Sequence, residues 1–204
     1  MLSSSNIMAA AGIAAISAAA SADITRVDEF SSLSIEGFQD LTMSTFESGS
    51  VDVFGGLGTV LSASDAWVHT TGAWVYEQRV QAYEGDLMLG SSHGGIKYQF
   101  DVAQRSFGGY FASISDTADG MISFYSNGSL VGVDSLVAPT DTSWAWNGWS
   151  SDTAFDSVVI SSNHSRGGFI MHDSVRVMFA EVPTPGTGGL LFGSMLVIAR
   201  RRRR

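Results

Sequence analysis

Three tryptophans stand within six residues in the sequence WAWNGW, at Trp144, Trp146 and Trp149. Flat aromatic faces suit stacking against sugar rings, whose C–H groups carry a weak positive charge. On an extended strand Trp144 and Trp146 share one face, because side chains alternate with a period of two. The spacing predicts a sugar-binding platform of these three rings. The alternative, that at least one of them packs in a core, stays open. Trp67 and Trp74 are weaker candidates for ligand contact.

Carboxylates near turns form a second candidate set. Asp116 and Asp119 lie in SDTADG, Asp28 lies near the start of the central region and Asp173 near its end. Calcium takes six to eight oxygen ligands, which loop carboxylates and backbone carbonyls supply. The alternative is that these side chains are ordinary solvated turn residues, since the EF-hand spacing is absent.

Known catalytic signatures are missing from the sequence. His69, His93, His164 and His172 show no metal-binding HExxH spacing, and no serine stands in a G-x-S-x-G elbow. No phosphate-binding P-loop or dinucleotide-binding glycine motif is present. The absence of cysteine excludes thiol catalysis and disulfides. We therefore expect no catalytic residues. A small polysaccharide hydrolase is the less favoured alternative. It stays open because the fold, and not the sequence spacing, sets the distance between an acid/base pair of carboxylates.

The N-terminal segment has the pattern of a secretory signal. Residues 7–20 are short and rich in alanine, and Ala20-Ser21-Ala22 supplies the small residues that a signal peptidase accepts. We expect residues 1–22 to form a signal peptide helix, with cleavage between Ala22 and Asp23.

The C-terminal segment, residues 182–204, has three parts in a fixed order. A proline motif precedes an apolar run over residues 188–199, which we expect to form a hydrophobic helix in the membrane, and an arginine block follows. Guanidinium groups do not enter hydrocarbon, so the arginines should stop transfer on the cytoplasmic side. A plain membrane anchor is the alternative, although the run is shorter than the ~20 residues that span a bilayer. The motif is Val182, Pro183, Thr184 and Pro185, and the block is Arg200, Arg201, Arg202, Arg203 and Arg204.

This tail resembles the PEP-CTERM sorting domain of bacterial cell-envelope and exopolysaccharide-associated proteins, and similar segments are also labelled as the C-terminal domain of ice-binding proteins. The resemblance rests on VPTPGT, the apolar run and the arginines; Thr184 stands where the family usually has glutamate. It implies recognition by an exosortase, a membrane protease that cuts near the proline motif.

We expect the central region, residues 23–181, to form one acidic domain. It holds all 20 Asp and Glu residues but six of the 11 Lys and Arg residues, a formal net charge of −14. Such a charge repels nucleic acid and anionic lipid. About 160 residues suit one domain with a real core.

Short alternating runs between turn signals predict an all-β fold. Ile96, Tyr98, Phe100 and Val102 share one strand face, and Asn127-Gly128 marks a tight hairpin. Alternation over residues 73–83 predicts a further strand, whereas residues 37–65 are compatible with a strand, a loop or a short helix. Further candidates are residues 107–114, 157–162, 168–172 and 174–180. Roughly nine strands at this spacing indicate a single β-sandwich, a jelly roll.

Residues 96–180 resemble a recurrent domain of PEP-CTERM proteins, which is itself similar to carbohydrate-binding, galactose-binding-like jelly rolls. The matching motifs are FYSNG at residues 124–128 and FIMHD at residues 169–173, where His172 replaces an acidic residue. The resemblance implies polysaccharide binding without catalysis. It also implies a structural calcium between the first and last strands, near Asp28 and Asp173.

Together these patterns predict an exported bacterial protein of the cell envelope, outer surface or extracellular matrix. Signal peptidase, an exosortase-like protease, the membrane and polysaccharide are its expected partners, and nucleic acid is excluded. The alternative is a purely structural envelope protein without a specific ligand. No cofactor other than calcium is expected.

Overall fold

The computed structural model describes residues 23–42, 44–46, 49–63, 67–75, 79–92, 95–114, 119–162 and 169–180. Every regular element in these ranges is a strand, which confirms the predicted all-β class. Within them no helix is long and apolar enough to cross a membrane. The helices expected in residues 1–22 and 182–204 lie outside the described residues. The strands are β1 (Ile24–Arg26), β2 (Ser34–Glu36), β3 (Ser44–Phe46), β4 (Ser50–Val53), β5 (Gly58–Ala63), β6 (Trp67–Thr71), β7 (Ala73–Val75), β8 (Arg79–Gln81), β9 (Met88–Ser92), β10 (Gly95–Ser113), β11 (Asp119–Ser126), β12 (Ser129–Val137), β13 (Ala145–Ser162) and β14 (Phe169–Phe179).

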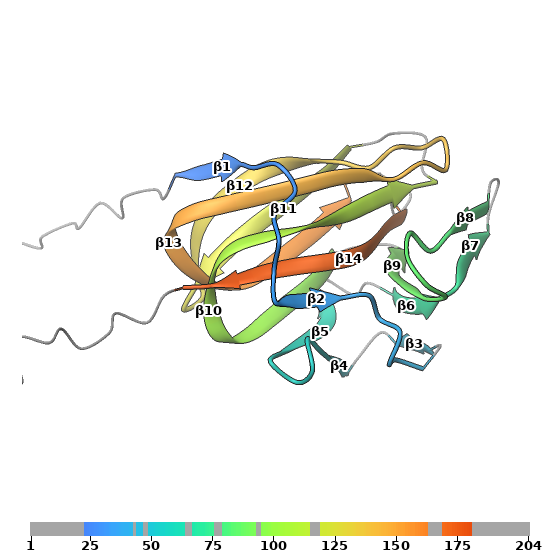
Figure 1. Ribbon diagram of the computed structural model, residues 1–204, viewed down its shortest axis with the longest axis horizontal. Coiled ribbons are helices and arrows are strands. Elements are labelled where there is room, and N and C mark those ends of the chain that lie inside the picture. Colours follow the sequence, from blue (N-terminus) through green and yellow to red (C-terminus); the bar gives the residue numbers. More distant parts are fainter. Residues whose placement is uncertain are drawn as a thin grey trace, which may run out of the picture.

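Two long strands, β10 and β13, run through both layers of a β-sandwich (Figure 1). In the first layer the order is β4-β5-β10-β13-β11-β12. In the second layer it is β1-β13-β10-β14-β9-β6-β3, with β2 also paired to β14. The register of β10 against β13 shifts between Gln99, Gln104 and Ser106. Such bulges bend a strand, which allows one strand to serve both sheets.

Aromatic side chains of the two layers meet in the main core. Tyr98 of the first layer contacts Phe107 of the second, with ring centroids 5.4 Å apart. Phe124 and Trp149 make the same kind of contact at 6.1 Å. All four side chains have no exposed surface. Because these rings come from opposite sheets, they join the layers into one domain.

A smaller core lies on the outer face of the second layer, beneath the hairpin of β7 and β8. The sequence suggested one strand over residues 73–83, but the chain turns back and Trp74 pairs with Val80. A period of two cannot distinguish one strand from two that turn back with the same face inward. The buried members of this core are Trp74, Val80, Met88, Ala112, Ile114 and Met171.

Other strand predictions hold with different boundaries. Asn127 and Gly128 have positive φ angles and close the hairpin of β11 and β12. The ambiguous residues 37–65 contain β3, β4 and β5. The runs over residues 168–172 and 174–180 fall mainly within one strand, β14. Val102 is 40% exposed although Ile96, Tyr98 and Phe100 are buried, because the bulge follows Phe100 and ends the alternation.

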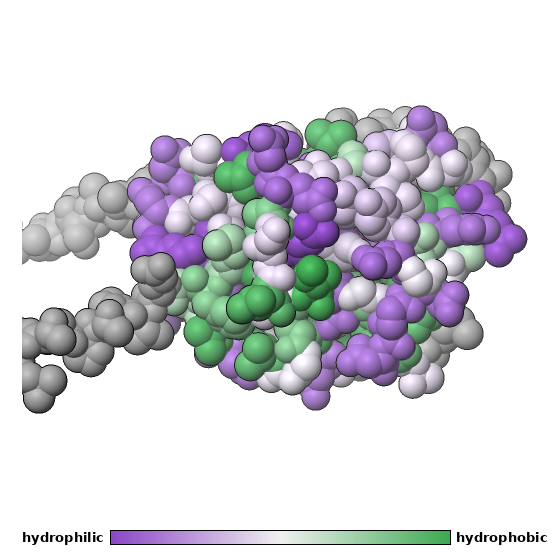
Figure 2. All heavy atoms as spheres, viewed as in Figure 1, coloured by the Kyte–Doolittle hydropathy of each residue, from purple (hydrophilic) through white to green (hydrophobic). Residues whose placement is uncertain are grey.

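The segment between β1 and β2 crosses the outer face of the second layer, over β13, β10 and β14 (Figure 1). Its backbone is tied down at several points, including Val27 N–H to Gly148 O at 2.9 Å. Apolar residues gather around β2 on the same side of the molecule (Figure 2), where Leu33 and Ile35 are exposed. The crossing segment divides this face into a covered part and an open part.

Candidate functional site

The three tryptophans of WAWNGW do not lie on one surface. Trp144 precedes β13, while Trp146 and Trp149 are on β13 and point to opposite faces of the second layer. Trp144 and Trp146 are half-buried on the outer face, and Trp149 is fully buried. The predicted platform therefore loses one of its three members.

Trp149 packs in the core, which is the alternative that the sequence left open for at least one of the three tryptophans. Its ring packs edge-on against Phe111 and Phe124, and its Nε1 donates to Asp134 Oδ2 at 2.8 Å. The guanidinium of Arg26 lies 5.7 Å from the ring centroid and is paired with Asp134 at 2.9 Å. With no exposed surface, Trp149 cannot present its ring to a ligand, so this part of the prediction is wrong.

Trp146 lies flat on two glycines of the outer face. A Cβ added at Gly108 would stand 2.7 Å from the indole Cζ2, and one at Gly148 would stand 2.8 Å from Nε1. The ring therefore occupies space that any other residue at these positions would fill. Its Nε1 donates to Val27 O at 3.2 Å, which fixes the ring beneath the crossing segment.

A charged network holds the crossing segment over this end of the face. Tyr110 Oη donates to Glu29 Oε2 at 2.7 Å, and Arg176 Nη2 pairs with Glu29 Oε1 at 2.6 Å. The guanidinium of Arg176 also lies 5.4 Å from the centroid of Trp146. The hydrogen bond from Tyr110 and the charge of Arg176 lower the pKa of Glu29. Hydrogen bonding with Tyr83, burial and Glu29 raise the pKa of Tyr110. The lowered pKa of Glu29 favours its carboxylate, and the raised pKa of Tyr110 favours the protonated hydroxyl that donates to it.

Four aromatic rings form a contiguous line on the outer face, here named the tyrosine–tryptophan row: Trp144, Tyr83, Tyr110 and Trp146. Tyr83 and Tyr110 stack with centroids 3.7 Å apart and planes at 14°. Trp144 adjoins Tyr83 at 6.1 Å, and Trp146 adjoins Tyr110 at 5.5 Å. Tyr83 is 44% exposed. The row offers a ligand an extended aromatic surface with one strongly exposed ring.

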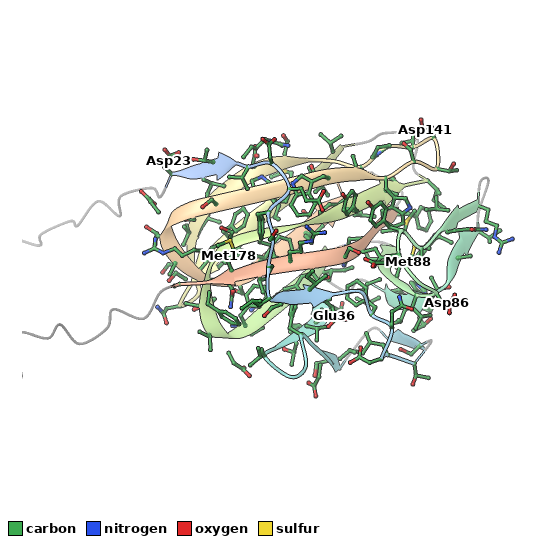
Figure 3. The ribbon with its side chains drawn as sticks, viewed as in Figure 1. Asp23, Glu36, Asp86, Met88, Asp141 and Met178 are labelled. Atoms are coloured by element: carbon green, nitrogen blue, oxygen red, sulfur yellow. The ribbon has the colours of Figure 1, made fainter. Side chains whose placement is uncertain are left out.

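Local turns position the end of the row at Trp144. Asp141 Oδ1 accepts from Ser143 N at 3.1 Å and from Ser143 Oγ at 2.5 Å, an Asx turn just before the tryptophan. Figure 3 shows Asp141 at the end of the sandwich away from Asp23. Trp144 Nε1 then donates to Gln81 O at 3.1 Å. These bonds hold the indole against the β7–β8 hairpin.

Asp173 acts as a clamp for Tyr83. Its Oδ2 accepts from Glu84 N at 3.0 Å and its Oδ1 accepts from Ser174 N at 2.6 Å. Ser174, with φ of 47°, sits at the bulge of β14 and donates from Oγ to Glu84 Oε2 at 2.7 Å. Burial raises the pKa of Asp173 to about 6, against the lowering effect of the backbone N–H groups. The carboxylate thereby holds the loop that places Tyr83 on Tyr110.

The predicted calcium ligands have separate surroundings. Asp173 is fully buried and its oxygens are taken by backbone N–H groups, whereas Asp28 lines an open hollow of about 510 Å³ beside Trp146. Within the described ranges, no three His, Asp or Glu side chains come together as a metal site would require. The residues around this hollow are Arg26, Val27, Asp28, Trp146, Asn147 and Gly148.

The described histidines differ in environment. His172 is fully buried among Phe38, Tyr98 and Phe111, and burial lowers its pKa to about 3. His69 lies on the outer face of the second layer, where burial lowers its pKa. His172 is a core residue, whereas His69 borders a second hollow.

Several predicted positions lie outside the described residues. These are Ala22 of the cleavage site, the sorting motif, the arginine block, Asp116, His93 and His164. Asp23 is described, and its backbone N–H donates to Asp152 Oδ1 at 3.2 Å.

Sequence reasoning missed Tyr83 and Tyr110, the centre of the row. Their signals were present: two glycines precede Tyr110, and Glu84-Gly85-Asp86 follows Tyr83. Their meeting depends on a contact across 27 positions of the chain, which no local pattern encodes.

No family model and no curated protein sequence matches this chain. Among solved structures, it is similar to the K2 cleaved adhesin domain of Lys-gingipain, with TM-score 0.46 and 11% identity over 72% of this chain and 97% of that one. It is also similar to the CBM22-1 xylan-binding domain from Paenibacillus barcinonensis Xyn10C, with TM-score 0.41 and 16% identity over 69% and 95% of the two chains. A third is the module TmCBM61 in complex with β-1,4-galactotriose, with TM-score 0.40 and 9% identity over 60% and 88%. Solved structures similar to this chain thus include carbohydrate-binding modules; at these identities and TM-scores they assign it neither ligand nor site.

Proposed function

We propose that this protein is an exported, non-catalytic module that binds neutral polysaccharide on the tyrosine–tryptophan row. The observation that carries the proposal is the contiguity of the row, in which Tyr83 stacks on Tyr110 between two tryptophans. Tyr83 is 44% exposed and is backed by Tyr110, so its ring can pack against the C–H groups of a sugar. Tyr83 is the principal stacking residue, and Trp144 and Trp146 extend the surface on either side.

The charges support an uncharged ligand. Arg176 is paired with Glu29 and Arg26 with Asp134, so these two cations beside the row are already neutralised. The net charge of −14 over residues 23–181 repels anionic glycans and nucleic acid. The hollow next to Trp146 adds the polar groups of Arg26 and Asp28, which suit hydroxyls.

The two ends of the chain support delivery to the outside of a bacterial cell. In this proposal residues 1–22 are removed between Ala22 and Asp23, and residues 182–204 are read by an exosortase-like membrane protease. The domain of residues 23–181 then acts at the cell surface or in the extracellular matrix. The supporting features are the tripartite tail and the small-residue cleavage pattern.

One observation favours the second candidate, a purely structural envelope protein. The two outer tryptophans use their indole N–H groups internally, Trp144 toward Gln81 and Trp146 toward Val27. These N–H groups are therefore not available to a ligand, and both indole rings are half-buried.

The test is affinity electrophoresis of the full chain in gels containing neutral xylan, galactan or glucomannan, with anionic alginate for comparison, in calcium and in EDTA. Tyr83→Ala should weaken retention by at least about tenfold, the equivalent of about 1.4 kcal/mol, in a neutral gel. Leu130→Ala, which removes an exposed apolar side chain from β12, is the matched control and should change nothing. Absence of retention in every neutral gel would leave the structural role, and equal retention of Tyr83→Ala would remove the row from the site. Loss of retention in EDTA would return calcium to the site.

A further inference from the structure

A second hollow, of about 530 Å³, lies at the other end of the same outer face. It is bordered by β3, β6 and β7 and by the start of β14. The polar and aromatic side chains that line it include Ser44, Thr45, His69, Thr71, Trp74 and Phe169. None of the described residues that line it is Asp, Glu, Lys or Arg, so we name it the uncharged hollow.

Aromatic rings wall the uncharged hollow. Trp67, 47% exposed, stacks on His69 with centroids 6.5 Å apart and planes at 29°. His69 meets the edge of Trp74 at 4.9 Å, and Trp74 contacts Phe169 at 5.9 Å. Trp74 is held in place from below, because a Cβ at Gly90 would stand 2.7 Å from its Cζ3. Trp67 therefore presents an open ring at the rim of a fixed aromatic wall.

Hydroxyl and imidazole groups supply the polar part. Thr45 Oγ1 and His69 Nδ1 are 2.8 Å apart, a bond between neighbouring strands β3 and β6. Burial lowers the pKa of His69, which keeps its ring uncharged at neutral pH. Neutral donors and acceptors beside aromatic faces are the groups that recognise a hydroxylated, uncharged ligand.

The β7–β8 hairpin separates this hollow from the row. β7 contributes Trp74 to the hollow, whereas the β8 carbonyl of Gln81 accepts from Trp144 of the row. Trp144 and Phe169 both pack against the same small core under the hairpin. A hairpin anchored by buried Trp74 and Val80 stands between two aromatic surfaces that share one face of the molecule.

We propose that the uncharged hollow, with Trp67 at its rim, is a second binding site for neutral sugar, so that one domain holds two glycan segments and bridges polysaccharide strands. This inference rests on the proposed function of the row. Two sites on one rigid face can each hold a separate strand, and several domains along the same pair of strands add their weak contacts into avid binding. Bridging of strands would give a matrix protein a cross-linking role.

The experiment uses the full chain and four variants: Trp67→Ala, Tyr83→Ala, both together, and Leu130→Ala as control. Calorimetric titration with xylohexaose, cellohexaose and mannohexaose measures the number of sites. Light scattering with soluble xylan, galactan and glucomannan measures bridging. Thr45→Val, which removes the hydroxyl facing His69 but keeps the side-chain shape, tests the hollow without deleting a ring, and unchanged unfolding midpoints show that each variant is folded.

We expect two equivalents of at least one hexasaccharide for the native chain and for Leu130→Ala, one for either single ring variant, and none for the double variant. Scattering with polymer should rise at least fivefold for the native chain and fall to the polymer background for each single ring variant. Thr45→Val should weaken one of the two sites by at least threefold.

The failures are distinguishable. One equivalent that is lost in Tyr83→Ala but kept in Trp67→Ala overturns the second site and leaves the row intact. One equivalent that is lost only in Trp67→Ala overturns the bridging role and also removes the row. No binding of any probe overturns both proposals.

Discussion

On β10, β13 and β14, side chains on the two faces of the second layer have different roles. Toward the core stand Trp149, Phe111 and His172, all fully buried. Trp146, Tyr110 and Asp173 face the outside. They hold the crossing segment and the row through hydrogen bonds with Val27, Glu29 and Glu84, respectively. The residue types on the two sides are similar, so identity alone does not reveal the role. The contacts that each side chain makes decide its role.

The largest contrast is between the two tryptophans of β13. Trp149→Ala deletes a fully buried ring in the main core and should lower the free energy of unfolding by about 3–5 kcal/mol. Trp146→Ala removes a half-buried ring and should cost about 1–2 kcal/mol by the same reasoning. Urea denaturation followed by far-ultraviolet circular dichroism measures both. Equal losses would show that the two faces are packed alike.

Asp173, which follows the core residue His172 on β14, should make the stability of the fold depend on pH. Burial raises the pKa of Asp173 from its ordinary value of 3.8 to about 6, so the folded state holds this proton more tightly than the unfolded state. Its contribution to stability is therefore fully present below pH 3.8 and is lost as the pH rises through about 6. Asp173→Asn stays neutral and should lose this dependence.

The measurement is urea denaturation of both proteins from pH 4 to 7. The unfolding free energy of the native chain, minus that of Asp173→Asn, should fall by up to roughly 3 kcal/mol across this range. A difference that is constant with pH would contradict the assignment. His172, with its pKa lowered to about 3, does not titrate in the same window.

The adjacent glycines of β10 give a smaller contrast. Gly108→Ala would place a methyl group 2.7 Å from the indole of Trp146 and 3.0 Å from Asn147 O, so the ring must move. We expect a cost of about 1–2 kcal/mol and an altered near-ultraviolet circular dichroism band. Gly109→Ala meets its neighbours at 3.3 Å and should cost less while leaving that band unchanged. A reversed order would mean that the outer ring is not seated on glycine.

The smallest effect belongs to Tyr110, whose inner neighbour is Phe111. Tyr110→Phe keeps the ring that stacks on Tyr83 but removes the hydroxyl that donates to Glu29 at 2.7 Å. The bond is partly exposed, so its loss should lower the unfolding free energy by about 0.5–1 kcal/mol. Thermal unfolding at matched pH measures the change. A loss above 2 kcal/mol would indicate that the crossing segment depends on this one bond.

Local sequence patterns predicted elements whose cause is local. The Asn127-Gly128 hairpin forms because both residues accept positive φ. The alternation of Ile96, Tyr98 and Phe100 is the alternation of a strand with one buried face. The same reasoning was wrong over residues 73–83, where two short strands present the same face to the core beneath them.

The sequence by itself determined the all-β class, the acidic charge and a cluster of aromatic residues that includes Trp144 and Trp146. Only the tertiary structure decided that Trp149 is core, that Asp173 clamps a loop, and that Tyr83 meets Tyr110. The physical reason is that strand alternation sorts side chains into two faces without saying which is covered. Coverage follows from pairing between strands distant in the chain and from the segments laid across them, here residues 27–33 and the β7–β8 hairpin.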